Sequence, residues 1–401
     1  MTRPQAPNNM MPAAVSPAAT QQASPKSQGP PENNLPKIAN YLADYSGCGF
    51  WRMLWPQQIL NAHSKAVVMN FSIMVYQPDF YKHLDAVRIQ RQATPYQLKF
   101  VEFLKQIQGE CGFRLIYEID DIIFREDIPD YNKFKPAFEP DEIRESSLRI
   151  MQLCDEITVT NPFMRDYYRE KTGKSEVTVI PNFVPKFWMG NYYDPNRVED
   201  LYKKNRRRPR VLYAGSGAHF DVENRTKQRD DFEHVLQAVI QSRYKYQWVF
   251  IGAFPMQLAQ YVQSGEIEFH PWSRMFEYPD LIHQLGVQAM VAPLQDNNFN
   301  RAKSDLKNIE AAAYGLPCIC QDMGTYKDAE VKFKTGSDMI RKLDEALSQP
   351  GQYSNNIPKR RALAEARFLE KDENIDCYLE VHKTPYGSPE RKMLSKWNDD
   401  V

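Results

Sequence analysis

Lys303, Lys307 and Glu310 are the residues whose types and spacing could do chemistry on a phosphorylated sugar. The two lysines can add positive charge next to a phosphate, because opposite charges attract at short range. Glu310, one helical turn after Lys307, can reach a pair of sugar hydroxyls. The alternative is a set of ordinary surface charges, and a short motif alone does not separate the two interpretations.

A helix has to position these three side chains, and the sequence predicts one inside the stretch from Asn298 to Pro317. The spacing of one buried helical face is followed by Leu306, Ile309, Ala312 and Ala313. Apolar runs at 287–294 and 318–320 predict a strand on each side. The loop and helix N-terminus of such a unit lie at the carboxyl ends of parallel strands, where α/β sheets bind ligands. Free N–H groups at that terminus suit a phosphate.

Gly47 and Gly49 punctuate a predicted turn before Arg52 and a helix expected at 53–62. Glycine lets the backbone approach a ligand closely. We therefore expect this turn near the ligand and Arg52 near the mouth of the same cleft. A plain loop with a surface arginine is the alternative.

Asp120 and Asp121 follow a buried strand predicted at 113–119. In an α/β sheet, acidic residues at this end of a strand point into the crevice. Acceptor binding, support of the cleft and helix capping stay open as their role. No metal site is predicted, because the sequence shows neither a Cys-x-x-Cys pair nor a Cys/His cluster.

Strand and helix patterns alternate along residues 66–182 and again along 211–320, which predicts parallel sheets. The expected fold class is α/β, with two Rossmann-like domains facing a cleft. The predicted parts are a disordered tail at 1–36, an N-terminal acceptor-side domain at 37–185, a basic connection at 186–209, a C-terminal domain at 210–350 and a helical extension at 351–401. The tail prediction follows from its Pro, Ala, Gln and Ser content.

The extension carries a long helical pattern at 359–382. Such a helix can either brace the N-terminal domain or pack on its own domain. The sequence leaves both possibilities open.

The overall charge gives no argument for nucleic acid or membrane, because Lys plus Arg and Asp plus Glu both total 51. One local run is strongly basic and comprises Lys203, Lys204, Arg206, Arg207, Arg208 and Arg210. It predicts either a solvated linker or a contact with a nucleic-acid backbone. No stretch approaches the roughly 20 apolar residues of a membrane span. Six scattered cysteines predict reduced thiols in a cytoplasmic protein.

Four segments resemble a GT-B glycosyltransferase, in particular the retaining, family-4-like group that uses nucleotide sugars. They are the glycine turn with Arg52 and Pro56, the Tyr-x-x-Asp-Asp strand end at 117–121, the Val-Ile-Pro-Asn segment at 179–182 and the stretch at 292–317. The Asp-Asp end is similar to a bacterial and phage subset. The resemblance covers residues 38–330 and implies a nucleotide sugar, in the first place a UDP-sugar, as co-substrate, without a bound metal.

The resemblance also implies donor-binding roles. Glu310 would bind the ribose hydroxyls, and Lys303 and Ser304 would hold the diphosphate at the start of the helix. The first loop of the C-terminal domain would face the phosphates through Gly215, Ser216 and His219. Gly47 and Gly49 would let the backbone of the N-terminal domain approach the ligand closely.

Trp272 and its neighbours correspond to the place where the family holds the base. Lys307 and Arg52 would stabilise the charge of the leaving diphosphate. Together with Asp120 and Asp121, they are the catalytic candidates. The sequence shows no evident Brønsted base. This fits transfer with retention of the anomeric configuration, for which the resemblance implies front-face attack assisted by the departing phosphate.

Ala302 departs from the family pattern. The family usually has a second glutamate eight residues before the ribose glutamate, and it contacts the transferred sugar. The departure weakens the prediction of an ordinary hexose contact, so the transferred sugar stays open between a hexose and a pentose.

Three hypotheses for function follow. The leading one is sugar transfer to a hydroxylated base in phage DNA, motivated by the basic run and the phage subset. The second is a transferase that acts on a surface polysaccharide or a protein. The third is a catalytically silent GT-B fold with a binding or structural role, which Ala302 keeps open.

Overall fold

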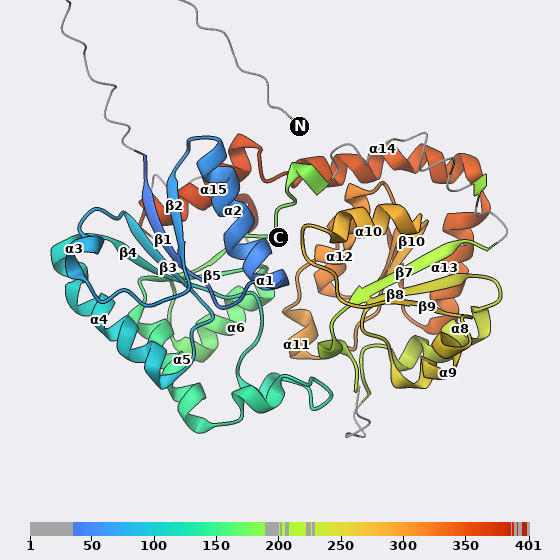
Figure 1. Cartoon of the computed structure of the whole chain (residues 1–401), viewed down its shortest axis with the longest axis horizontal. Coiled ribbons are helices and arrows are strands. Elements are labelled where there is room, and N and C mark those ends of the chain that lie inside the picture. The colour runs from blue at the N-terminus through green and yellow to red at the C-terminus, as the bar shows by residue number, and fades with distance from the viewer. Residues whose placement is uncertain are drawn as a thin grey trace, which may run out of the picture. The chain divides into compact units, whose positions relative to one another are not determined.

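Two six-stranded sheets, parallel in every pairing, form the framework of the chain (Figure 1). The computed structural model describes residues 35–188, 200, 203–204, 208–221, 226, 229–385, 387–388, 391 and 395–398. Almost all of the predicted tail and most of the predicted basic connection lie outside the described residues. Helices connect successive strands in both sheets, so the predicted α/β class with two Rossmann-like domains is confirmed.

The N-terminal sheet has the strand order β2-β1-β3-β4-β5-β6. Its strands are β1 (Lys37–Tyr41), β2 (Val67–Phe71), β3 (Ala86–Gln90), β4 (Arg114–Glu118), β5 (Glu156–Val159) and β6 (Val177–Val179). Neighbouring residues of a strand face opposite sides, so Ile116 packs in one apolar cluster and Leu115 in another. The chain runs from β1 to β2 and then returns to β3 on the other side of β1. The topological switch point, where such sheets bind ligands, therefore lies between β1 and β3.

The C-terminal sheet has the order β12-β11-β10-β7-β8-β9. Its strands are β7 (Arg210–Gly215), β8 (Gln247–Gly252), β9 (Glu268–His270), β10 (Ala289–Ala292), β11 (Cys318–Gln321) and β12 (Val331–Phe333). The chain leaves β7 toward β9 and returns to β10 on the other side of β7. The switch point of this sheet therefore lies between β7 and β10.

The helices of the N-terminal domain are α1 (Gly47–Gly49), α2 (Trp55–Ala62), α3 (Pro78–Tyr81), α4 (Pro95–Cys111), α5 (Asp141–Leu153) and α6 (Pro162–Thr172). α4 shows how local sequence sets a boundary. Thr94 and Gln97 form a capping box at its start, and Gly112, with φ of 81°, ends it. The helix expected at 53–62 begins earlier, because α1, a π-helical segment Phe50–Leu54 and α2 are continuous.

The helices of the C-terminal domain are α8 (Glu233–Ser242), α9 (Ala259–Gln263), α10 (Tyr278–Leu285), α11 (Asn298–Arg301), α12 (Leu306–Ala313), α13 (Gly336–Ser348) and α14 (Pro350–Ala366). The helix predicted inside the stretch from Asn298 to Pro317 is α12, and the short helix α11 lies in the part that was expected to be a loop. The strands β1 and β12 and the helix α13 were not predicted.

The single helix predicted at 359–382 is wrong, because α14 ends at Ala366 and α15 (Asp372–Lys383) starts after a break. In the break, Phe368 forms a β-bridge with Val184, and Leu369 donates its backbone N–H to Val184 at 2.9 Å. α14 packs on α12, whereas α15 contacts α2 and β4 of the N-terminal domain, and α16 (Ser395–Asn398) contacts β6. Within the described ranges, no helix combines the length and the apolar composition that a membrane crossing needs.

Candidate functional site

The candidate site lies at the carboxyl ends of β7 and β10, the switch point of the C-terminal sheet. After β7, the Ser216 hydroxyl accepts the Ala218 N–H at 3.2 Å and starts a 3₁₀ turn over Gly217–His219. Gly215 is required at the strand end, because a Cβ there would lie 2.6 Å from the Tyr213 hydroxyl. After β10 the chain enters α11 and then α12. Lys303 lies between these two helices, whereas Lys307 and Glu310 lie on α12.

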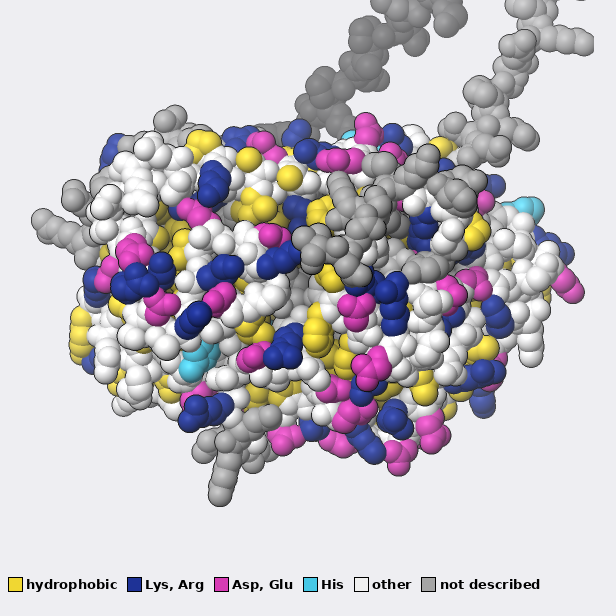
Figure 2. Space-filling view, turned by 180° about the vertical axis from the view of Figure 1, so that it is seen from behind, with side chains coloured by type: hydrophobic (Ala, Val, Ile, Leu, Met, Phe, Trp, Pro, Cys, Tyr) yellow, Lys and Arg dark blue, Asp and Glu magenta, His cyan; other side chains and the backbone are white. Residues whose placement is uncertain are grey.

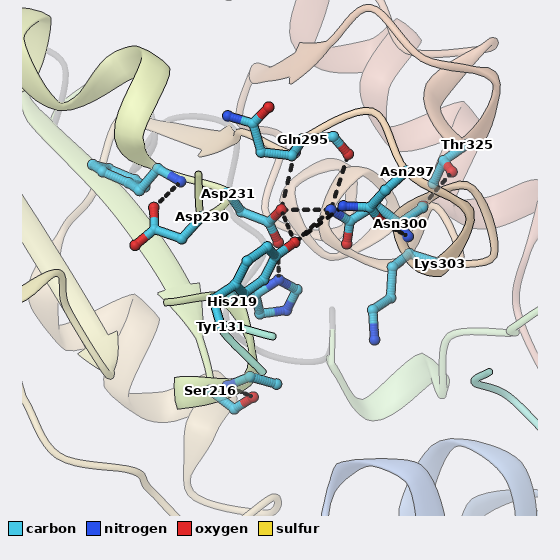
Figure 3. A network of polar contacts seen from close by, with 12 residues as sticks. Tyr131, Ser216, His219, Asp230, Asp231, Gln295, Asn297, Asn300, Lys303 and Thr325 are labelled. Carbon is cyan, nitrogen blue, oxygen red and sulfur yellow. Dashed lines mark hydrogen bonds and ion pairs between the residues drawn. The ribbon is translucent and has the colours of Figure 1, made fainter. Parts of the chain in front are cut away.

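His219 belongs to a buried polar network (Figure 3). Its Nδ1 lies 2.7 Å from Oδ2 of Asp231, which is fully buried. Oδ1 of Asp231 accepts the Tyr131 hydroxyl at 2.8 Å, the Gln295 backbone N–H at 3.0 Å and the Asn300 side-chain amide. Asp231 therefore joins a loop of the N-terminal domain to the segment between β10 and α11.

The Asp231 contact fixes the form of the His219 ring. Because the carboxylate oxygen accepts, Nδ1 carries the hydrogen and Nε2 keeps its lone pair. Burial lowers the pKa of His219, nearby Lys307 lowers it further, and Asp231 offsets part of this effect. The ring is therefore neutral near pH 7, and its Nε2 makes no hydrogen bond with the described residues.

Three lysines surround the turn at Gly217. Lys303 lies 2.9 Å from Asp121 of the N-terminal domain and 4.0 Å from the Phe299 ring centroid. Lys307, in the first turn of α12, lies 5.5 Å from the Tyr213 ring centroid. The Lys133 ammonium nitrogen would lie 3.2 Å from a Cβ placed on Gly217. The sequence predicted two of these cations and missed Lys133, which comes from the other domain.

Lys307 and Glu310 lie one turn apart on α12, and each affects the pKa of the other. Burial lowers the pKa of Lys307, and the Glu310 charge offsets part of that effect. Burial raises the pKa of Glu310, while Lys307 and a hydrogen bond from the Tyr278 hydroxyl act in the other direction. Each group is thus displaced toward its neutral form. Groups with pKa values shifted in this way are typical of functional sites.

The structure corrects the predicted position of Lys303 and Ser304. α12 begins at Leu306, so both residues precede the helix instead of starting it. The Ser304 hydroxyl accepts the side-chain amide of Asn182 at 2.9 Å. The side-chain amide of Asn161 donates to the Ala302 carbonyl at 2.8 Å and to the Lys303 carbonyl at 3.0 Å. Amides of the N-terminal domain therefore hold the chain that leads into α12.

Ala302 is fully buried and packs with Phe299 in the apolar cluster of the N-terminal sheet. The position where the resembled family has a sugar-contacting glutamate therefore faces a hydrocarbon environment.

Arg52 is fully buried, so the expectation that it lies at the mouth of a cleft is wrong. Its Nε lies 2.6 Å from Glu118, and Nη1 donates to the Ile180 carbonyl at 2.7 Å and to the Asn182 side chain at 3.0 Å. Burial by itself would lower the pKa of Arg52, but the charge of Glu118 raises it. Through Asn182, which bonds Ser304, Arg52 supports the C-terminal site from a distance.

The two N-terminal glycines lie in a helix start capped by Asp44. The Asp44 Oδ1 accepts the backbone N–H of Ser46 at 2.8 Å and of Gly49 at 3.1 Å. A Cβ on Gly49 would lie 1.9 Å from the Asp44 carbonyl oxygen, whereas one on Gly47 would meet open space. Gly49 is thus needed for packing at this helix start.

Asp120 lies beside Cys48 and Arg91 at the switch point of the N-terminal sheet. Burial raises the pKa of Asp120, while Arg91 and the Cys48 thiol act against this shift. The backbone of Arg91 adopts a φ of 47°, which is strained for a residue other than glycine. The Arg91 Nη2 donates to the Asp44 carboxylate at 2.5 Å. The sequence did not mark Arg91 as a site residue, although it follows a buried strand just as Asp120 does.

Trp272 lies in the loop after β9, and its side chain is 55% exposed. A Cβ on Gly252, at the end of β8, would lie 3.0 Å from the Trp272 ring. The ring therefore lies against Gly252 at the end of the C-terminal sheet, and more than half of the residue is exposed.

The basic run is only partly described. Lys203 and Lys204 are exposed, and Arg206 and Arg207 lie outside the described residues. Arg208 donates to the carbonyls of Arg243 and Glu266, both at 2.9 Å, and Arg210 lies 2.6 Å from Glu268. These two arginines are thus engaged within the C-terminal domain.

A hollow of about 500 Å³ lies between the loop at 126–135 and the start of α11. Its charged lining groups are paired: Asp130 with Lys135, and Asp296 with Arg301. Among the described residues, no group of three or more His, Cys, Asp or Glu side chains could hold a metal ion.

Comparisons with known proteins establish the fold. No family model and no curated protein matches the sequence. Among solved structures, Anabaena HepE (Alr3699) in complex with UDP-glucose has a TM-score of 0.58 at 11% identity, covering 86% of this chain and 99% of that one. The HepE complex with UDP and glucose gives 0.55 at 10% identity, with coverages of 83% and 95%. With its two parallel six-stranded sheets, the chain has the GT-B fold.

Proposed function

We propose that this protein transfers a sugar from a nucleotide-sugar donor, in the first place a UDP-sugar, to an acceptor hydroxyl. The observation that carries the proposal is the grouping of Lys303, Lys307, Glu310 and His219 at the switch point of the C-terminal sheet. HepE, which shares the fold, was crystallised with UDP-glucose and with UDP. The structural similarity to HepE supports the fold, and the charged side chains at the site support a nucleotide sugar as the donor.

In this proposal, each part of the donor meets a different group. The lysines neutralise the diphosphate, whose charge grows as the bond to the sugar breaks. Glu310 accepts hydrogen bonds from the ribose hydroxyls, and the exposed Trp272 ring offers a surface on which a base can stack. Arg52 acts on this site only through Asn182 and Ser304.

Two features bear on the sugar and on stereochemistry. The burial of Ala302 removes the usual glutamate contact, so the sugar must be recognised by other groups. Retention rests on the family resemblance. Asp120, whose pKa burial raises, is one of the carboxyl groups near the other switch point and would be the base in an inverting reaction. The anomeric proton couplings of the product, measured by NMR, separate the two outcomes.

The acceptor prediction, a hydroxylated base in DNA, rests on the basic run. Lys203 and Lys204 are exposed and suit a phosphate backbone, whereas Arg208 and Arg210 are engaged within the domain. Figure 2 shows basic and acidic side chains interspersed over the visible face, in line with the formal net charge of zero. Mass spectrometry of DNA nucleosides, with and without the protein expressed, tests this acceptor against a polysaccharide or protein.

Glu310→Gln tests the donor site. We expect UDP binding, measured by calorimetry, to weaken by about 1.5–3 kcal/mol, or roughly 10–100-fold, because a hydrogen-bonded charge is lost. The glutamine oxygen can still accept the Tyr278 hydroxyl, so the fold should persist. Glu345→Gln, at an exposed position of α13, is the matched control.

Slow hydrolysis of UDP-sugars by the wild type, reduced in Glu310→Gln, would support an enzyme. Binding of UDP without turnover of any common donor would favour the catalytically silent fold. Equal UDP affinity in wild type and Glu310→Gln would remove Glu310 from the site.

A further inference from the structure

His219 uses only one of its two ring nitrogens for hydrogen bonds with the described residues. It is 8% exposed, its Nδ1 is held by Asp231, and its Nε2 has no partner among the described residues. Because no described residue uses the Nε2 lone pair, a ligand at this turn can form a hydrogen bond with it.

The groups that face His219 define what that ligand can be. Lys307 and Lys303 are close enough to affect its titration. Lys133 lies against Gly217, two residues earlier in the same turn. Asp231 is the negative group on the other side of the ring, and it also accepts from Tyr131. A ligand that meets Nε2 in this surrounding is an anion, and a phosphoryl oxygen can only accept a hydrogen bond.

We infer that His219 binds the diphosphate of the donor as an imidazolium, with Nε2–H donated to a phosphoryl oxygen and Nδ1–H to Asp231. The inference rests on the proposed function, and it adds that donor binding takes up a proton from solvent. That proton goes to Nε2, whose lone pair is free in the unliganded protein. No covalent bond changes in this step.

The direction of the pH effect follows from linkage. In the free protein, burial and the lysines lower the pKa of His219, so the ring is neutral near pH 7. In the complex, the negative phosphates raise the pKa of the same ring. Between the two pKa values the complex holds one more proton than the free protein. The affinity for a nucleoside diphosphate therefore rises as pH falls through this window, by up to about tenfold per pH unit.

His219→Gln and His219→Asn separate the role of Nε2 from that of Nδ1. The glutamine amide places an N–H near the Nε2 position but cannot titrate. The asparagine amide can bond Asp231 but does not reach the ligand. His63→Gln, at an exposed position after α2, is the control for loss of a histidine.

The experiment is calorimetry with UDP in buffers of different ionisation enthalpy between pH 6 and 8.5, which counts the protons taken up. Two other groups titrate in this range: the terminal phosphate of UDP, with a second pKa of ~6, and Glu310. Both are present with every variant, so they contribute equally to the proton uptake of each. The difference between wild type and His219→Gln therefore isolates His219. We expect wild type and His63→Gln to take up more protons than His219→Gln, and His219→Asn to bind more weakly at every pH.

Equal proton uptake in wild type and His219→Gln would overturn the inference and leave the proposed function intact, because UDP would still bind. Absence of UDP binding to the wild type would overturn both. Circular dichroism of His219→Gln and His219→Asn shows whether either variant is folded. If one is not, Asp231→Asn provides the second arm, because loss of the counter-charge should reduce the proton uptake.

Discussion

The buried cluster around Glu118 and the candidate site hold their charges in opposite states. In the N-terminal domain, Arg52 and Glu118 stabilise each other's charged forms, so the pKa of Arg52 is raised and that of Glu118 is lowered. In the C-terminal domain, burial shifts Lys307, Glu310 and His219 toward their neutral forms. In the first cluster each arginine lies against the Glu118 carboxylate, whereas in the second, burial disfavours the charges of both Lys307 and Glu310. Charge compensation thus separates a supporting cluster from a binding site, although both are buried and both follow strands.

Removal of Glu118 should give the largest effect on stability. Glu118→Ala leaves Arg52 and Arg88 buried without their counter-charge, which we expect to cost about 3–5 kcal/mol. Urea unfolding measures the loss. Asp79→Ala removes an exposed partner of Lys82 and should leave the stability nearly unchanged. Similar losses in the two variants would show that the buried cluster is not the support described here.

Removal of Lys307 should affect binding instead. Lys307→Met is expected to weaken binding of both UDP and pyrophosphate by about 1.5–3 kcal/mol, because a charged donor to the diphosphate is lost. Stability to urea should not fall, since the variant removes a desolvated ammonium group. Lys359→Met, at an exposed position of α14, serves as the control. A large loss of stability with unchanged affinity would place Lys307 with the supporting cluster.

Removal of the Trp272 ring should give the smallest effect. Trp272→Ala is expected to weaken UDP binding by about 1 kcal/mol, in the lower part of the range for stacking of a base on an aromatic ring. Pyrophosphate, which has no base, should bind the variant as well as the wild type. Tyr244→Ala removes another exposed aromatic side chain of the same domain and controls for a general surface effect. Equal losses for UDP and pyrophosphate would exclude stacking on Trp272.

Periodic patterns predicted most strands and most helix cores of both sheets, because burial of one or both faces dictates their composition. The failures occurred where a distant segment decides the backbone. The break between α14 and α15 depends on the pairing of Phe368 with Val184, far apart in sequence.

The sequence also located Lys307 and Glu310, because both belong to one helix whose spacing can be read. It placed His219 near the site but could not predict its partner. Asp231 comes from a later segment, and Tyr131 and Lys133 come from the other domain. Arg52 was expected near an open cleft, although a buried glutamate 66 residues later determines its place. Contacts between residues so far apart in the sequence leave no local sequence pattern from which they could be predicted.

The burial of Ala302 has a consequence for protein engineering. A substitution of Ala302 by glutamate, the residue found in the resembled family, would place a carboxylate against Phe299 in the apolar cluster of the N-terminal sheet, at a desolvation cost of several kcal/mol. A carboxylate contact is therefore not available at that position by a single exchange. A redesign would have to start from other loops, or rebuild the contact between α11 and the N-terminal sheet as a unit.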